Sequence, residues 1–148
     1  MLIHPGIVPS SNHNSYIMGK KDKRIRELYT PNIPEPKGHY SQAVQFNDTI
    51  YVSGQLPVNP FTGEQVQGGI EEQTAQVLEN ISTILKDCGS DKRKILKTTV
   101  YISDISLWPA VNEIYKKFFG SFKPSRSVVP TKELHYGVLV EIEAIAAV

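Results

Sequence analysis

The chain has 148 residues, of which 40% are hydrophobic, and its 16 Lys and Arg nearly balance its 15 Asp and Glu. This length fits one ordinary domain, and the balanced charge argues against an intrinsically disordered chain and against a dedicated nucleic-acid binder. The single cysteine, Cys88, excludes an internal disulfide and any zinc site built from several cysteines.

The expected location of the protein is the cytoplasm. No apolar run approaches the roughly 20 residues that cross a bilayer, and the first residues lack the basic start and apolar core of a secretory signal. One thiol also suits a reducing compartment. We therefore expect neither a membrane nor a nucleic acid as a partner.

Residues 1–37 are predicted to form an N-terminal extension that is poorly ordered or lies on the surface. Five of the ten prolines fall here, together with a polar stretch that has no periodicity. The basic run from Lys20 to Arg26 fits either a nucleic-acid or membrane arm or a solvated lead-in. Met18 is an alternative start for the chain.

Residues 38–148 are predicted to form a single domain. Runs rich in Val, Ile and aromatic residues at 43–46 and 50–53, with turn residues between them, predict a β-hairpin, and a short segment at 64–67 is a further candidate strand. Apolar residues recur with a 3.6-residue period over 70–88 and over 107–119, which predicts two helices, the second capped by Ser106. Segments 96–102, 125–129 and 138–148 have the composition of strands.

This order of elements predicts an α+β domain of two layers, in which both helices cover one face of a mixed β-sheet. In the last strand, every second position from Val138 to Ala146 is apolar and should lie under the helices. The alternate positions combine apolar residues with Glu141 and Glu143. Such a face suits either self-association through the sheet or partial exposure to solvent.

Two charged residues in the last strands are the strongest candidates for chemistry. Arg126 presents a rigid fork of donors to a carboxylate, unless it forms a structural salt bridge. Glu141 holds or activates a water as a general acid or base, unless it is a surface residue or pairs with Lys97 across the sheet. The four histidines lack the spacing of a helical zinc motif, so no metal is expected.

Six short blocks then give the sequence a specific pattern: GHYSQA at 38–43, YVSGQLP at 51–57, EQTAQVLEN at 72–80, VNEIY at 111–115, KPSRS at 123–127 and EIEAIA at 141–146. Together and in this order they closely resemble the RidA/YjgF family of reactive-intermediate enamine and imine deaminases. The resemblance covers about residues 38–148. It implies a chorismate-mutase-like fold and a homotrimer in which three sheets line a central β-barrel, with sites in the clefts between subunits.

The resemblance also implies an activity, the hydrolysis of 2-imino acids and enamines such as 2-aminoacrylate to 2-keto acids and ammonia, without a metal or organic cofactor. Arg126 resembles the arginine that binds the substrate carboxylate, and Glu141 resembles the glutamate that orients the attacking water. Further positions match residues that line the pocket or approach the ligand. This implied substrate-binding set is Tyr40, Gly54, Asn112, Ser127 and Val128.

Two departures from the family pattern leave alternatives open. His39 stands where most members have proline, and Val128 stands where most members with this activity have cysteine. A non-catalytic trimer that binds a keto acid or another small carboxylate is therefore the second hypothesis. A third, an RNA-directed role, rests on the basic run near the N-terminus and on reports for parts of the family.

Overall fold

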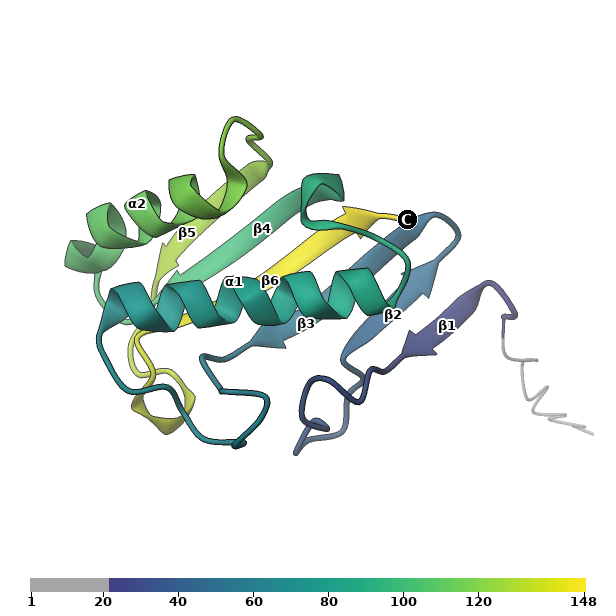
Figure 1. The fold of residues 1–148 in the computed structure, drawn as a ribbon, viewed down its shortest axis with the longest axis horizontal. Helices are drawn as coiled ribbons and strands as arrows, with labels where there is room; N and C mark the ends of the chain where they lie inside the picture. The colour runs from purple at the N-terminus through teal and green to yellow at the C-terminus, as the bar shows by residue number, and fades with distance from the viewer. Residues whose placement is uncertain (1–21) are drawn as a thin grey trace, which may run out of the picture.

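The computed structural model describes residues 22–148, which form a six-stranded sheet with two helices on one face (Figure 1). The helices are α1 (Ile70–Asp87) and α2 (Trp108–Phe119). The strands are β1 (Ile25–Leu28), β2 (Ala43–Phe46), β3 (Thr49–Gln55), β4 (Ile95–Ile102), β5 (Ser125–Pro130) and β6 (Val140–Ala147). These elements confirm the predicted α+β class and mixed sheet.

The sheet has the strand order β1-β2-β3-β6-β4-β5. All neighbouring strands are antiparallel except β4 and β5, which are parallel because α2 connects them as a crossover. The C-terminal strand β6 therefore lies at the centre, between β3 and β4. Neither helix described in residues 22–148 combines the length and the apolar character that crossing a bilayer requires.

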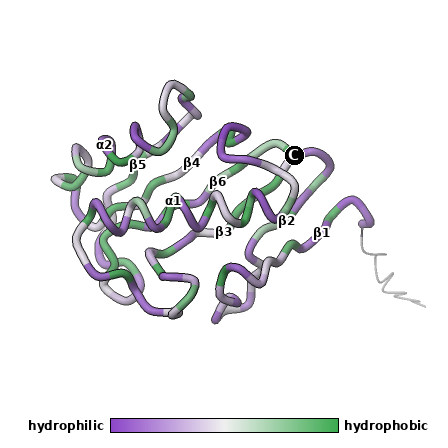
Figure 2. The backbone as a smooth tube through the Cα atoms, viewed as in Figure 1, coloured by the Kyte–Doolittle hydropathy of each residue, from purple (hydrophilic) through white to green (hydrophobic). Residues whose placement is uncertain are grey.

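The core lies between the helices and one face of the sheet. In β6 the residues at even positions, from Val140 to Ala146, are at most 2% exposed, whereas Glu141, Glu143 and Ile145 on the other face are half-buried. The apolar stripe of α1 packs against this buried face. Figure 2 shows the resulting interleaving of hydrophobic and hydrophilic residues along the helices and the central strands. The predicted orientation of the last strand is thus confirmed.

The predicted boundary between an extension and the domain is wrong for residues 22–37. β1 pairs with β2 inside that segment, and Ile33 is 6% exposed in the core. The side chain of Gln42 holds the segment in place. Its Oε1 accepts the N–H of Thr30 at 2.6 Å, and its Nε2 donates to the carbonyls of Thr30, Ile33 and Pro34. Residues 1–21, with Met18 and the start of the basic run, lie outside the described residues.

Two smaller predictions are also corrected. Ser106 does not cap α2, because its N–H donates to Asp104 in the preceding 3-10 turn and the helix begins at Trp108. The segment at 64–67 is no strand, since only an isolated bridge joins Gln65 to Val58.

Candidate active site

Glu141 lies on the face of the sheet that no helix covers, opposite Tyr101 of β4. It therefore does not pair with Lys97, which lies opposite Ile145. Burial raises the pKa of the Glu141 carboxyl, and Glu143 adds to this effect while His135 opposes it. A partly desolvated carboxyl with a raised pKa can exchange a proton with a nearby water.

The Glu141 carboxyl lies against the backbone of Gly54. A Cβ added at Gly54 would lie 3.1 Å from the carboxyl carbon of Glu141 and closer still to Oε1, so only glycine leaves room for this side chain. Gly54 sits where the pairing of β3 with β6 shifts register between Val52 and Gln55. This irregularity is the local feature that brings the two residues together.

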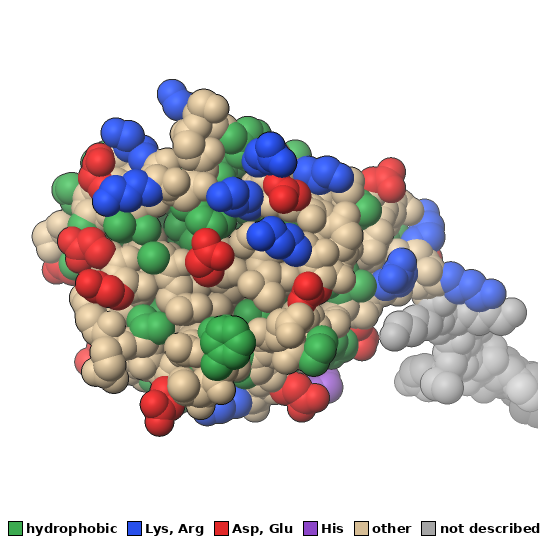
Figure 3. All heavy atoms as spheres, in the orientation of Figure 1, with side chains coloured by type: hydrophobic (Ala, Val, Ile, Leu, Met, Phe, Trp, Pro, Cys, Tyr) green, Lys and Arg blue, Asp and Glu red, His purple; other side chains and the backbone are tan. Residues whose placement is uncertain are grey.

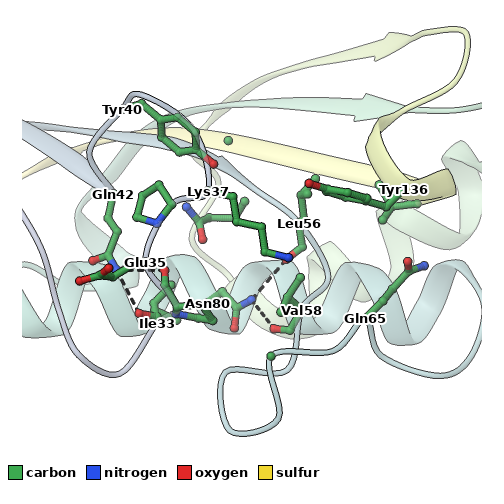
Figure 4. A pocket seen from close by; sticks show the side chains of 16 residues that line it. Ile33, Glu35, Lys37, Tyr40, Gln42, Leu56, Val58, Gln65, Asn80 and Tyr136 are labelled. Atoms are coloured by element: carbon green, nitrogen blue, oxygen red, sulfur yellow. Dashed lines mark hydrogen bonds between the residues drawn. The ribbon is translucent and has the colours of Figure 1, made fainter.

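Gly54 also lines a cavity of about 350 Å³ next to the sheet. Figure 4 shows Tyr40 and Tyr136 on opposite sides of this cavity, with their hydroxyl ends directed toward its middle and Lys37 between them. Tyr40 is 54% exposed. Of the predicted residues, Gly54 therefore adjoins both the Glu141 carboxyl and the cavity that Tyr40 lines, while Glu141 itself does not line the cavity.

Arg126 lies on β5, at the edge of the sheet, and is held by α2. Its Nη1 and Nη2 each donate to Oδ1 of Asn112 at 3.2 Å, and its guanidinium carbon lies 4.7 Å from the ring centroid of Tyr115. No carboxylate among residues 22–148 pairs with Arg126, so the predicted alternative of a structural salt bridge is wrong. The remaining donors of the fork are available to an anion.

Arg126 and Glu141 lie on opposite faces of the sheet within one chain. Arg126 is opposite Thr98, whose hydroxyl contacts Tyr115 of α2 under the helices, and Thr98 is opposite Ala144 on the same buried face. Glu141 is three positions from Ala144, and thus on the other face. The backbone of Arg126 lies two strands away from β6, and Glu141 lies three residues along β6 from the position level with Arg126. These two displacements place the backbones of Arg126 and Glu141 roughly 14 Å apart. One chain therefore holds two separate halves of the predicted site.

The other predicted residues divide between these halves. Val128 shares the helix-covered face with Arg126 and packs against the core, whereas Ser127 is exposed on the opposite face. Asn112 belongs to the Arg126 half through its hydrogen bonds. Within residues 22–148, no group of three or more His, Cys, Asp or Glu side chains comes together that could hold a metal ion.

The charges on the helix-bearing face are mixed in sign. Figure 3 shows Lys and Arg interspersed with Asp and Glu over the helix-bearing face. An anionic substrate would therefore be attracted by local groups such as Arg126 rather than by a broad basic surface.

A protein-family model described as Endoribonuclease L-PSP matches residues 30–148. The chain belongs to this family. The resemblance to the RidA/YjgF family is thereby confirmed. The match begins at residue 30, before the predicted domain boundary at residue 38, and the ordered strand β1 likewise lies before that boundary.

Three relatives within the RidA/YjgF family illustrate the range of similarity. A human protein named 2-iminobutanoate/2-iminopropanoate deaminase is 43% identical over 121 residues, which are 82% of this chain and 88% of that protein. YyfA of Yersinia pestis, described as a protein of unknown function of the conserved Rid protein family, is 47% identical with a TM-score of 0.80, covering 84% and 99% of the two chains. TdcF of E. coli with bound serine is 36% identical with a TM-score of 0.78, covering 83% and 98%.

Sequence reasoning missed two parts of the site in this RidA/YjgF family member. Tyr115, assigned only to the apolar stripe of the helix, also supports the guanidinium of Arg126, and its i, i+3 spacing from Asn112 was an available signal. Tyr136 and the segment around Lys37 line the cavity, and no periodicity in their loops pointed to that role.

Proposed function

We propose that this protein hydrolyses reactive 2-imino acids and enamines, such as 2-aminoacrylate and its imine tautomer, to 2-keto acids and ammonia. The observation that carries the proposal is the half-buried carboxyl of Glu141, which lies against Gly54, a residue that lines the same cavity as Tyr40. The name of the human relative, 2-iminobutanoate/2-iminopropanoate deaminase, supports the same chemistry.

The active site in this proposal is shared between neighbouring copies of a homotrimer with a central β-barrel. The two halves of the site lie on opposite faces of one sheet, so a second copy must supply Arg126 to the Glu141 of the first. The helix-free face, on which Tyr51 is 47% exposed, is the surface that such an assembly would cover. The cytoplasm remains the proposed location.

In the proposed reaction, Arg126 binds the substrate carboxylate through its free donors, while Asn112 and the ring of Tyr115 hold the guanidinium in place. Glu141 accepts a proton from a water molecule while the oxygen of that water forms a bond to the imine carbon. The electron pair of the C=N bond moves to nitrogen. Glu141 then returns the proton to that nitrogen, which gives a carbinolamine. Glu141 next takes the proton of the new hydroxyl and passes it to the nitrogen as the C=O bond forms and the C–N bond breaks, so that ammonia and a 2-keto acid leave. The protein supplies orientation and proton transfer, because an imine carbon is already electrophilic.

The test is imine turnover by purified protein. A dehydratase generates the imine, and loss of the imine is followed for wild type, Arg126→Ala and Glu141→Ala. The loss of a bidentate carboxylate contact should reduce kcat/KM by about 100-fold or more. Wild-type protein that fails to accelerate imine loss, yet binds a keto acid saturably, would support the second hypothesis of a non-catalytic binding protein.

A further inference from the structure

Glu143 is a second carboxyl on the helix-free face, two residues along β6 from Glu141. Alternate residues of a strand share a face, so the backbones of the two glutamates lie roughly 7 Å apart. Both side chains are half-buried, and within residues 22–148 no ion pair neutralises Glu143. Two like charges are thus held near each other where the proposed reaction transfers protons.

Tyr101 of β4 lies beside both carboxyls. It is directly opposite Glu141, whereas Thr99 is opposite Glu143. The phenol nonetheless reaches diagonally to Glu143, and its hydroxyl donates to Oε1 of that carboxylate at 2.8 Å. This hydrogen bond, together with burial and the charges of both glutamates, raises the pKa of Tyr101. The phenol therefore keeps its proton and remains a donor.

The hydrogen bond from Tyr101 holds the Glu143 carboxylate in its ionised form and in one orientation. Burial is the largest cause of the raised pKa of Glu141, and the negative charge of Glu143 adds to it. Gly54 of β3 contributes no charge, and His135 favours the ionised form. In the proposed assembly, Arg126 of a neighbouring copy would act in the same direction as His135.

A carboxylate whose ionised form is disfavoured takes up a proton more readily. A general base also works best when its pKa lies near the working pH. A fixed negative charge two residues away therefore strengthens Glu141 as a base, provided that the charge cannot turn away into solvent. The contact with Tyr101 meets this condition.

We propose that Glu143, fixed by Tyr101, is a positioning residue that helps Glu141 take a proton from the attacking water. This inference rests on the proposed function and adds two residues to it. Glu143 stays ionised throughout, and Glu141 alone exchanges protons with the water and with the substrate nitrogen.

The test combines the pH profile of kcat/KM for imine turnover with the titration of Glu141, followed by carboxyl ¹³C NMR through the resonance that Glu141→Gln lacks. Glu143→Gln removes the charge and keeps an acceptor for Tyr101. It should move the acidic limb of the profile and the Glu141 midpoint to lower pH by about 0.5 unit or more. The plateau of kcat/KM should fall, because Glu141 becomes a weaker base. Glu79→Gln, an equal change of charge at an exposed position of α1, should move neither.

Tyr101→Phe is a second variant that does not depend on how Glu143→Gln folds. Loss of the hydroxyl frees Glu143 to turn toward solvent, so the Glu141 midpoint should again fall, by less than in Glu143→Gln. In the Glu143→Gln background the same substitution should move the midpoint no further. Unmoved midpoints in both folded single variants would overturn the positioning role and leave the proposed function intact. Wild-type protein without imine turnover would instead refute the proposed function, and the role in proton transfer with it, even if the midpoints move.

Discussion

Replacement of Gly54 by alanine tests the contact that defines the Glu141 half of the site. The new Cβ would lie 3.1 Å from the carboxyl carbon of Glu141 and 3.4 Å from its Cγ, and Oε1 would be closer than either. Carbon atoms in contact are normally about 3.5–4.0 Å apart. The Glu141 side chain must therefore move by on the order of 1 Å, or leave its position altogether.

Two consequences follow from this displacement. A misplacement of about 1 Å in a catalytic group reduces turnover by roughly 100-fold. Insertion of a methyl group into an occupied space costs about 1–3 kcal/mol of unfolding free energy, which corresponds to a decrease in Tm of roughly 3–4 °C per kcal/mol for a chain of this size. Gly54→Ala should thus lower both imine turnover and Tm.

The assay is a double-mutant cycle with Glu141→Ala, with turnover and Tm measured at a fixed protein concentration. Truncation of Glu141 removes the clashing atoms, so Gly54→Ala should cost almost no stability in that background. Gly69→Ala is the matched control, because a Cβ there meets nothing closer than 3.8 Å and φ is −96°. It should cost about 0.5–1 kcal/mol at the start of α1 and leave turnover unchanged. A fully active Gly54→Ala, or a stability loss that persists without Glu141, would refute the reasoning.

Three further predictions concern single groups. Burial raises the pKa of Glu141 in the folded protein above its ordinary value of 4.5. The folded state is therefore most stable with respect to this group below pH 4.5, where the carboxyl is protonated, and it loses that stability as the pH rises through the raised pKa. Glu141→Gln should therefore increase Tm at pH 7, by an amount that shrinks toward pH 4.5, while it abolishes turnover. Asn112→Ala removes the acceptor that holds Arg126, and we expect KM for imines to rise by about tenfold with a smaller change in kcat, measured by steady-state kinetics. Gln42→Leu leaves buried backbone groups of the N-terminal segment without partners, and should cost about 2–4 kcal/mol in thermal unfolding and speed hydrogen exchange at the Thr30 amide; unchanged exchange would contradict this role.

The elements with strong periodic patterns could be predicted from the sequence. The apolar stripe of α1 and the alternation along β6 each identify the buried face, because burial against a helix layer requires apolar residues at those positions. β1 could not be predicted. Its sequence, IREL, is almost entirely exposed and carries no burial pattern. Its position depends on backbone pairing with β2 and on hydrogen bonds from Gln42, which lies at least 14 residues further along the chain.

The residue types of the candidate site were predictable, but not their separation. The facing of Glu141 follows from alternation along β6. The face of the sheet on which Arg126 lies is set by the parallel pairing of β5 with β4 and by the contact with Asn112. The run SRSVVP has no alternation of apolar and polar residues that would indicate this face. A division of one site between two faces of a sheet is a property of strand order, which composition and periodicity do not encode.

The measurement that tests the central claim most directly is complementation between two inactive variants, Arg126→Ala and Glu141→Gln. Each variant is purified alone, the two are refolded together in equal amounts, and imine turnover is measured once native mass spectrometry shows mixed assemblies. If the site combines Arg126 of one copy with Glu141 of its neighbour, random mixing restores both residues at about a quarter of the sites, and activity returns to about that fraction of wild type. Mixed assemblies that stay as inactive as either variant alone would contradict the account.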